Sequence, residues 1–432
     1  MHNFFKSHTL ITGTILLTFA GMLTRIMGFF YKIFLSRTIG AEGLGIYQLV
    51  FPIMGLCISL TSSGIQTSIS RHVAIEEGKH NPAGSKLYLY AGLILSCTLS
   101  VIVNRLLYQK ADFIADCILK EPRCAPLLQV VSYAFLPCAI HACINGYCYG
   151  RKKAAVPALS QLLEQIIRIG SVYLFCLILN SKGMQLNAAM AVWGITLGEI
   201  GGMLLSLSVV HFGKASGSLN RAMKNLCSLA IPLTASRLII NLFATFENTM
   251  IPIKLKDFGY TSTEALSVYG ILTGMALAII MAPNALTGSI SVMLLPSISS
   301  AEATDDKPFI CSAIKKTIFL SLLFGFLCTF IFLVTAPFIG NIIFQNTLAA
   351  TFIKILCWIC PFIYLNTTLS GILHGLGKAG ATFLMQLLGC GIRILFILYA
   401  IPVLGIRGYL YGLLVSSITI TICSVLFLKK NI

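Results

Sequence analysis

The residues of this chain that are able to bind a ligand are charged and polar side chains inside long apolar segments. Arg25 interrupts an apolar run that begins at Thr9, and Arg237 has the same place in a later run. An arginine in the middle of a membrane-spanning helix costs about 2.5–3.5 kcal/mol on insertion scales, and by default such a residue faces a cavity rather than lipid. A guanidinium presents paired donors that match phosphate oxygens. We therefore predict that both arginines bind a pyrophosphate, with ion pairing to an acid such as Glu247 as the alternative.

A second group of polar residues accompanies the arginines. Glu164 and Arg168 are spaced i, i+4, so they share one helix face, where they neutralise each other or form a latch that opens when cargo competes for Arg168. Asn241 lies one turn after Arg237 and is placed to bind a sugar hydroxyl. Four residues are candidates for a coupling proton or sodium ion or for gating, with structural hydrogen bonding as the alternative: Glu164, Glu199, Glu247 and Asn248.

The sequence contains no recognisable catalytic constellation. We find no nucleophile triad and no glycine-rich phosphate loop, and Cys357 and Cys360 lie within an apolar run without further thiolates nearby. Three histidines show no ligand spacing, so we expect them to pack inside the protein or at an interface: His141, His211 and His374. We therefore expect no enzyme, no catalytic residue, no cofactor and no metal site.

The elements that must position these residues are membrane helices. Of the 432 residues, 57% are hydrophobic and 10% charged, with a mean hydropathy of +0.88. Apolar stretches repeat from end to end, which predicts an all-α polytopic membrane protein. The net charge of +17 is not arranged as a basic helix with interleaved aromatic residues, so nucleic acid is not an expected partner.

The apolar segments predict about twelve spans of about 20 residues or more. The predicted ranges are 9–37, 44–72, 84–107, 125–149, 154–179, 187–211, 224–252, 265–298, 309–337, 350–374, 379–402 and 407–428. Lysine and arginine are more frequent in the loops on one side, including the side of both termini. The positive-inside rule then places both termini in the cytoplasm.

A faint internal repeat divides the chain into residues 1–213 and 214–432. Thr24-Arg25 has a counterpart in Ser236-Arg237, each in the middle of the first helix of its half. Because each half holds an even number of spans, both halves enter the membrane from the same side. A pseudo-twofold axis along the membrane normal would relate them, with a central cavity between two six-helix lobes. Arg25 and Arg237 would face each other across that cavity.

Several segments carry a resemblance to a known family. The run Gly40 to Pro52, Gly-Ala-Glu-Gly-Leu-Gly-Ile-Tyr-Gln-Leu-Val-Phe-Pro, resembles the stage V sporulation protein B family of the multidrug/oligosaccharidyl-lipid/polysaccharide exporter superfamily. The other matching segments extend to the last span: Ser63-Gly64-Ile65 with Ser70, Ile231-Pro232, Tyr269-Gly-Ile-Leu-Thr-Gly-Met-Ala-Leu277, Leu295-Pro-Ser-Ile298, Gly371-Ile-Leu-His-Gly-Leu-Gly-Lys378 and Gly405-Ile-Arg-Gly408.

The resemblance implies two six-helix lobes in a V shape and alternating access. It also implies a lipid-linked cell-wall or polysaccharide precursor as cargo. Arg25, in Thr-Arg-Ile-Met-Gly28, matches the motif that places a cavity arginine in the first helix of related peptidoglycan-precursor flippases. Their other cavity arginines have no counterpart here, because the chain is apolar around Leu56 and Leu272. The chain also has about twelve spans where many relatives have fourteen.

We therefore predict a flippase of the bacterial cytoplasmic membrane. It would move an anionic, pyrophosphate-linked glycan lipid from the inner to the outer leaflet, with membrane lipids, a coupling H⁺ or Na⁺ and cell-wall synthesis enzymes as partners. One alternative is a proton- or sodium-coupled multidrug antiporter of the same superfamily, which the positive charge within the spans disfavours. The other is a non-transporting membrane scaffold for cell-wall or spore-envelope synthesis.

Overall fold

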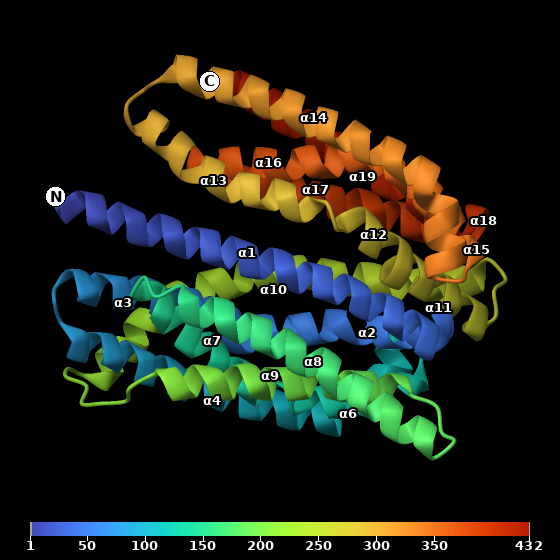
Figure 1. The fold of residues 1–432 in the computed structure, drawn as a ribbon, viewed down its shortest axis with the longest axis horizontal. Helices are drawn as coiled ribbons and strands as arrows, with labels where there is room; N and C mark the ends of the chain where they lie inside the picture. Colours follow the sequence, from blue (N-terminus) through green and yellow to red (C-terminus); the bar gives the residue numbers. More distant parts are fainter. Residues whose placement is uncertain (1, 432) are drawn as a thin grey trace. The chain divides into compact units, whose positions relative to one another are not determined.

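The computed structural model describes residues 2–431, except for the side chains of residues 2–15, 293, 296, 303 and 431. Helices follow one another along this range (Figure 1). Between residues 2 and 431 there is no strand. In this range, 11 helices are long and apolar enough to cross a membrane, or 12 if the bent pair Pro122–Ser132 and Phe135–Gly150 counts as one span. These findings confirm the all-α polytopic class that the composition predicts.

The chain begins with the helices from α1 to α10, most of which Figure 1 labels. They are α1 (His2–Thr38), α2 (Gly40–Ile58), η1 (Ser59–Ser63), α3 (Gly64–Gly78), α4 (Pro82–Gln109), α5 (Ala111–Phe113), η2 (Ile114–Leu119), η3 (Pro122–Cys124), α6 (Ala125–Ser132), α7 (Phe135–Gly150), α8 (Ala155–Ser181), α9 (Ala188–Val209) and α10 (Leu219–Asp257).

The remaining helices complete the chain. They are α11 (Ser262–Gly270), η4 (Ile271–Ala276), α12 (Leu277–Met281), α13 (Asn284–Ala303), α14 (Lys307–Phe338), η5 (Ile339–Ile343), α15 (Thr347–Leu356), η6 (Cys357–Ile359), α16 (Cys360–Gly375), α17 (Ala379–Leu395), η7 (Phe396–Ala400), α18 (Ile401–Leu404) and α19 (Ile406–Asn431).

The residues group into two compact units. Unit 1 consists of Met1–Gly28 and Ile46–Thr245, and unit 2 of Phe29–Gly45 and Phe246–Ile432. Two long helices, α1 and α10, therefore each contribute their first part to unit 1 and their last part to unit 2. The division at residues 213 and 214 describes the sequence repeat and stays a prediction.

Two features of the backbone recur in both halves of the chain. A π-helical turn interrupts the second span of each half, as η1 after α2 and as η4 after α11, and another follows the third span, as η2 and as η5. Such turns insert an extra residue into a helix and are frequent at functional sites. Their matching places support an internal duplication.

Glycine packing repeats in the same way. A Cβ atom on Gly146 of α7 would lie 2.6 Å from the carbonyl oxygen of Gln66 in α3. A Cβ on Gly371 of α16 would lie equally close, 2.6 Å, to the carbonyl oxygen of Ser291 in α13. Small residues let membrane helices approach to backbone contact. In each half, the fourth span thus packs on the second through a glycine that has no room for a side chain.

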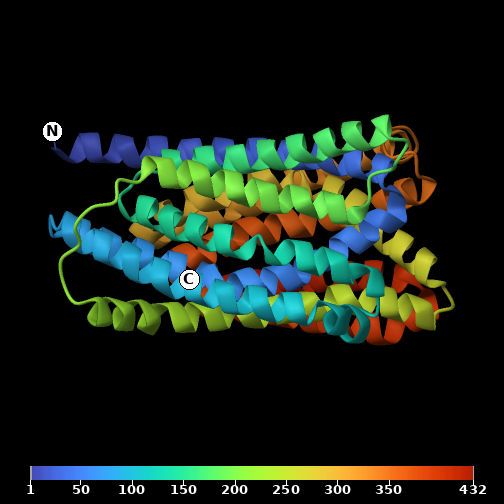
Figure 2. The same ribbon diagram turned by 90° about the horizontal axis from the view of Figure 1, so that it is seen from below.

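Each unit has its own apolar core. In unit 1 it is formed by side chains such as Ile69 of α3, Leu89 of α4 and Ile144 of α7. In unit 2 it includes Ile298 of α13 and Leu369 of α16. Helices α8 and α9 of unit 1 run side by side, as Figures 1 and 2 show, and the candidate site residues of the fifth and sixth spans lie on this pair.

Candidate functional site

Arg25 is exposed in the middle of α1, within the candidate span Leu16–Thr38. Among the residues that the structure describes, its guanidinium has no hydrogen-bond or ion-pair partner. Gly28, one turn further along, faces α8, because a Cβ there would lie 3.5 Å from Nε2 of Gln165. Residues three apart share a helix face, so Arg25 lies on a face of α1 that borders the fifth span of unit 1.

Arg237 is the first of three polar side chains spaced one turn apart along one face of α10, followed by Asn241 and Thr245. Its Nη2 donates to Oγ1 of Thr67 in α3 at 3.3 Å, and both side chains are exposed. One turn on, Nδ2 of Asn241 donates to Oγ of Ser59 at 2.5 Å, and the hydroxyl of Thr245 then donates to a carbonyl oxygen of α2. Asn241 and Thr245 thus hold α10 against the second span, while Arg237 keeps most of its donors for a ligand.

A second polar group lies between α7, α8 and α9 of unit 1. Arg168 forms an ion pair with Glu164 on the same helix, the pairing that their spacing favours. Glu199 of α9 approaches His141 of α7, with 3.7 Å between its Oε2 and the imidazole Nδ1. One ligand atom from each of His141, Glu164 and Glu199 lies within 4.8 Å of the other two. Of the residues that the structure describes, these three are the ones grouped closely enough for a metal ion.

Glu247 belongs to a separate polar group in unit 2. It is 6% exposed and accepts hydrogen bonds from Nε of Arg393 at 2.8 Å and from the hydroxyl of Tyr409 at 2.7 Å. The sequence named Glu247 as an alternative partner of Arg237, and the structure pairs it with Arg393 instead. The neighbouring Asn248 accepts a hydrogen bond from the hydroxyl of Tyr269 at 3.0 Å.

Spacing along the sequence does not predict the roles of His141, Tyr409 and Thr67. Each of these residues contacts a candidate residue only because two helices pack together, so spacing within one helix does not predict the contact. One signal was available for the first of them. Glu164 and Glu199 lie in consecutive spans joined by a short loop, and such neighbours pack as an antiparallel pair. Two acids inside one helical hairpin indicate that a further polar partner is required nearby.

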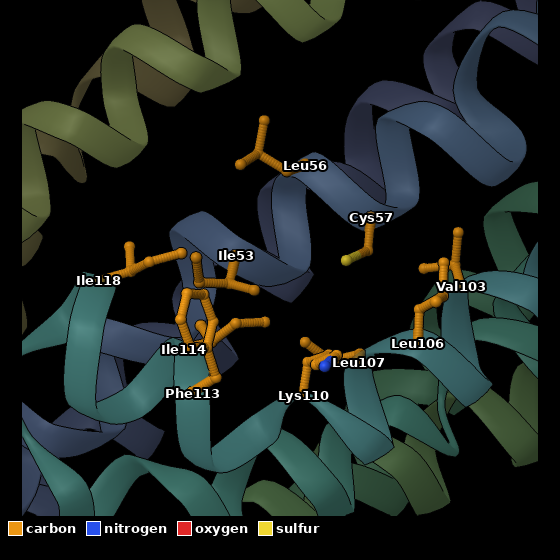
Figure 3. A pocket seen from close by; sticks show the side chains of 10 residues that line it. All are labelled: Ile53, Leu56, Cys57, Val103, Leu106, Leu107, Lys110, Phe113, Ile114 and Ile118. Atoms are coloured by element: carbon orange, nitrogen blue, oxygen red, sulfur yellow. The ribbon is translucent and has the colours of Figure 1, made fainter.

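Unit 1 also has an apolar pocket, shown in Figure 3. Its volume is about 520 Å³, and α2, α4 and η2 supply most of its lining, including Ile53, Leu107 and Ile114. Lys110 is the one basic side chain of the lining, and the other lining residues are apolar or cysteine. Such a pocket suits hydrocarbon chains, with the lysine able to meet a phosphate at its edge.

A family model described as "polysaccharide biosynthesis protein" matches residues 10–302, which is more than half of the chain. The chain belongs to the polysaccharide biosynthesis protein family. Stage V sporulation protein B of Bacillus subtilis (strain 168) is 28% identical over 426 residues, 96% of this chain and 82% of the relative. This match confirms the resemblance found from the sequence motifs.

Solved structures of two kinds of transporter share the fold. A lipid II flippase MurJ in an inward closed conformation has a TM-score of 0.76 at 15% identity, covering 96% of this chain and 87% of that chain. An inward-facing multidrug resistance MATE family transporter of the MOP superfamily also has 0.76 at 15% identity, covering 95% and 94%. The chain is a multi-pass membrane protein with this transporter fold, and the fold fits both kinds equally well.

Proposed function

We propose that this protein is a flippase that moves a lipid carrying a pyrophosphate-linked glycan from the inner to the outer leaflet by alternating access. The observation that carries the proposal is Arg25, an exposed guanidinium halfway along a spanning helix without a partner among the described residues. Family membership and the fold shared with a lipid II flippase support it. A guanidinium inside a span suits an anionic lipid rather than an organic cation, which it would repel.

The chemistry of the two exposed arginines suits a pyrophosphate. A guanidinium binds two phosphate oxygens at once, and hydrogen bonds to charged groups contribute about 1.5–3 kcal/mol each. Arg237 lies in the same unit as Arg25, and its Nη2 donates one hydrogen bond to Thr67. The amide oxygen of Asn241 remains for a sugar hydroxyl, since its amide nitrogen is used in packing. Arg168 is held by Glu164 and would bind cargo only after that pair opens.

The proposal also includes the membrane, the orientation and the energy source of transport. We place the protein in the bacterial cytoplasmic membrane with both termini in the cytoplasm, as the loop charges favour. Transport would be driven by the membrane potential or by a coupling H⁺ or Na⁺. Glu199 is a better candidate for that ion than Glu247, whose carboxylate already meets a guanidinium and a hydroxyl. Cell-wall synthesis enzymes would supply the cargo.

Complementation tests this function in cells. A bacterium depleted of its own precursor flippase should grow when it expresses this protein, if the two handle the same cargo class. Arg25→Ala should reduce rescue at least tenfold at equal membrane abundance, since the charge-assisted hydrogen bonds are lost. Arg25→Lys should rescue in part, because an ammonium keeps the charge and loses the paired geometry. Arg221→Ala is the control, because Arg221 is exposed near the start of α10.

The rival functions give different results. An antiporter should export ethidium from vesicles and should tolerate Arg25→Ala, because a cation gains nothing from that guanidinium. A scaffold should retain its effect on cell-wall synthesis after Arg25→Ala and should copurify without a lipid pyrophosphate. Full rescue by Arg25→Ala would therefore contradict the flippase proposal.

A further inference from the structure

We propose that His141, Glu164 and Glu199 form a binding site for a single divalent transition-metal ion of the Zn²⁺ type in unit 1. The three ligand atoms come from α7, α8 and α9 and lie within 4.8 Å of one another. The imidazole Nδ1 is 3.7 Å from Oε2 of Glu199, which is too long for a hydrogen bond. Two ligands that share a tetrahedral zinc ion with bonds of about 2.0–2.2 Å are about 3.4 Å apart. The spacing is thus close to what an ion between them requires.

Hydrogen bonding behind His141 presents the correct nitrogen to the ion. The hydroxyl of Ser160 donates to the carbonyl oxygen of Pro157 at 3.2 Å. Its single proton is therefore used, so at 3.0 Å the Nε2–H of His141 must donate to this hydroxyl oxygen. Nδ1 then carries the free lone pair on the side of the carboxylates. Metal-bound histidines are held in this way, with the other ring N–H donated to a group outside the ligand shell.

The backbone around the site is shaped for the imidazole ring. His141 is 7% exposed, and it packs against α9 at Gly202. A Cβ atom on Gly202 would lie 3.0 Å from Cε1 and 3.2 Å from Nδ1 of His141. A Cβ on Gly198 would lie 2.8 Å from the carbonyl oxygen of Glu164. The two glycines of α9 therefore give α7 and α8 the close approach that brings the three ligands together.

The charges of the group favour a cation. The two carboxylates supply negative charge, which the guanidinium of Arg168 offsets in part, and His141 binds as the neutral imidazole. Arg168 contacts Oε1 of Glu164, which leaves Oε2 for the metal. An arginine in this position orients the carboxylate and lowers the affinity for a cation. The thiol of Cys138, one turn before His141 and adjacent to Glu199, is a suitable fourth donor.

Zinc binding to the full-length protein in nanodiscs tests the site. Exposed thiols would confuse the measurement, so the test uses the Cys117→Ser/Cys311→Ser background, which removes the two exposed cysteines. Metal analysis after incubation with ZnCl₂ and removal of free ions should give one zinc per chain. Titration calorimetry should show at least tenfold weaker binding for His141→Gln and for Glu199→Gln, and tighter binding for Arg168→Gln. His374→Gln is the matched control, because His374 is exposed in unit 2 and should change nothing.

Two results would overturn the proposal. One is a protein that holds no zinc at micromolar ZnCl₂, which leaves a polar cluster without an ion. The other is zinc binding that His141→Gln and Glu199→Gln do not weaken. Since a variant can fail to fold, the X-ray absorption spectrum of the zinc-loaded parent protein identifies the zinc ligands without any substitution. Nitrogen and oxygen ligands at about 2.0–2.1 Å support the site, and a shell of sulfur alone contradicts it.

Discussion

Each unit of this protein holds acidic side chains among its spanning helices, buried for Glu247 of unit 2 and half-buried for Glu164 and Glu199 of unit 1, and the two surroundings differ. In unit 2, the carboxylate of Glu247 meets one guanidinium and one hydroxyl at hydrogen-bond distance. In unit 1, Arg168 pairs with Glu164, and Glu199 lies 3.7 Å from an imidazole nitrogen of His141. The first group is electrically balanced and the second carries surplus negative charge.

This difference separates a structural contact from a binding site. Buried charges are tolerated when each is paired and its hydrogen bonds are made. Glu247, Arg393 and Tyr409 satisfy that condition with protein atoms, so the group ties α10 to α17 and α19. The group in unit 1 holds two carboxylates and one guanidinium beside a neutral imidazole, so its charges do not balance, and a bound cation would supply the missing positive charge. Substitutions in the two groups should therefore have effects of different size and sign.

The largest expected effect is in unit 2. Glu247→Leu leaves the half-buried guanidinium of Arg393 without its carboxylate, which should cost about 3 kcal/mol of unfolding free energy, the low end of the range for a broken buried pair. Chemical unfolding in mixed micelles measures this change. The double variant Glu247→Leu/Arg393→Leu should recover most of the loss, because an apolar pair replaces a buried ion pair at little cost. If the double variant is no more stable than the single one, the pairing does not explain the effect.

Tyr409→Phe should have the next largest effect. It removes one hydrogen bond to the Glu247 carboxylate and leaves the ion pair with Arg393 intact. A hydrogen bond to a charged group contributes about 1.5–3 kcal/mol, so the variant should lose that much stability in the same unfolding experiment. Tyr411→Phe is the control, because Tyr411 is exposed on the same helix. Equal stability of the two variants would show that the hydroxyl of Tyr409 does not contribute to the free energy of unfolding.

Gly202→Ala tests the fit of the group in unit 1. The new methyl group would press on the imidazole of His141 and displace Nδ1 from the carboxylates. The affinity for zinc should fall about tenfold, as it does when the orientation of a metal ligand is disturbed. Gly170→Ala on α8 has nothing within 4 Å of its Cβ and should bind zinc as the parent does. Equal affinities would show that the position of the imidazole ring is not important.

The smallest effect is expected for Glu199→Gln in metal-free protein, and its sign is opposite. The substitution removes the surplus negative charge while Glu164 keeps its pair with Arg168. Unfolding free energy should stay the same or rise by up to about 1 kcal/mol, the order of a like-charge contact that is partly screened. A loss comparable to that of Glu247→Leu would mean that Glu199 is a structural residue, and the contrast between the units would disappear.

The sequence predicted those features that depend on local pattern. The span expected at 379–402 is found as Ala379–Leu404, and the i, i+4 pair of Glu164 and Arg168 is formed. Contacts between helices were not predictable in the same way. Glu247 and Arg393 lie in spans far apart along the chain, and His141 reaches Glu199 only because glycines let α9 approach α7. Apolar periodicity defines where a helix lies, whereas its partners depend on packing that one sequence does not display.

The most direct test of the proposed function is the rate at which the reconstituted protein moves a labelled lipid between leaflets. Vesicles would contain a fluorescent lipid with a pyrophosphate-linked sugar, and an added quencher would report the fraction in the outer leaflet over time. We expect transfer by the parent protein, at least tenfold slower transfer by Arg25→Ala, intermediate transfer by Arg25→Lys and parental transfer by Arg221→Ala. Transfer by Arg25→Ala at the parental rate, or none by the parent protein, would contradict the proposed function.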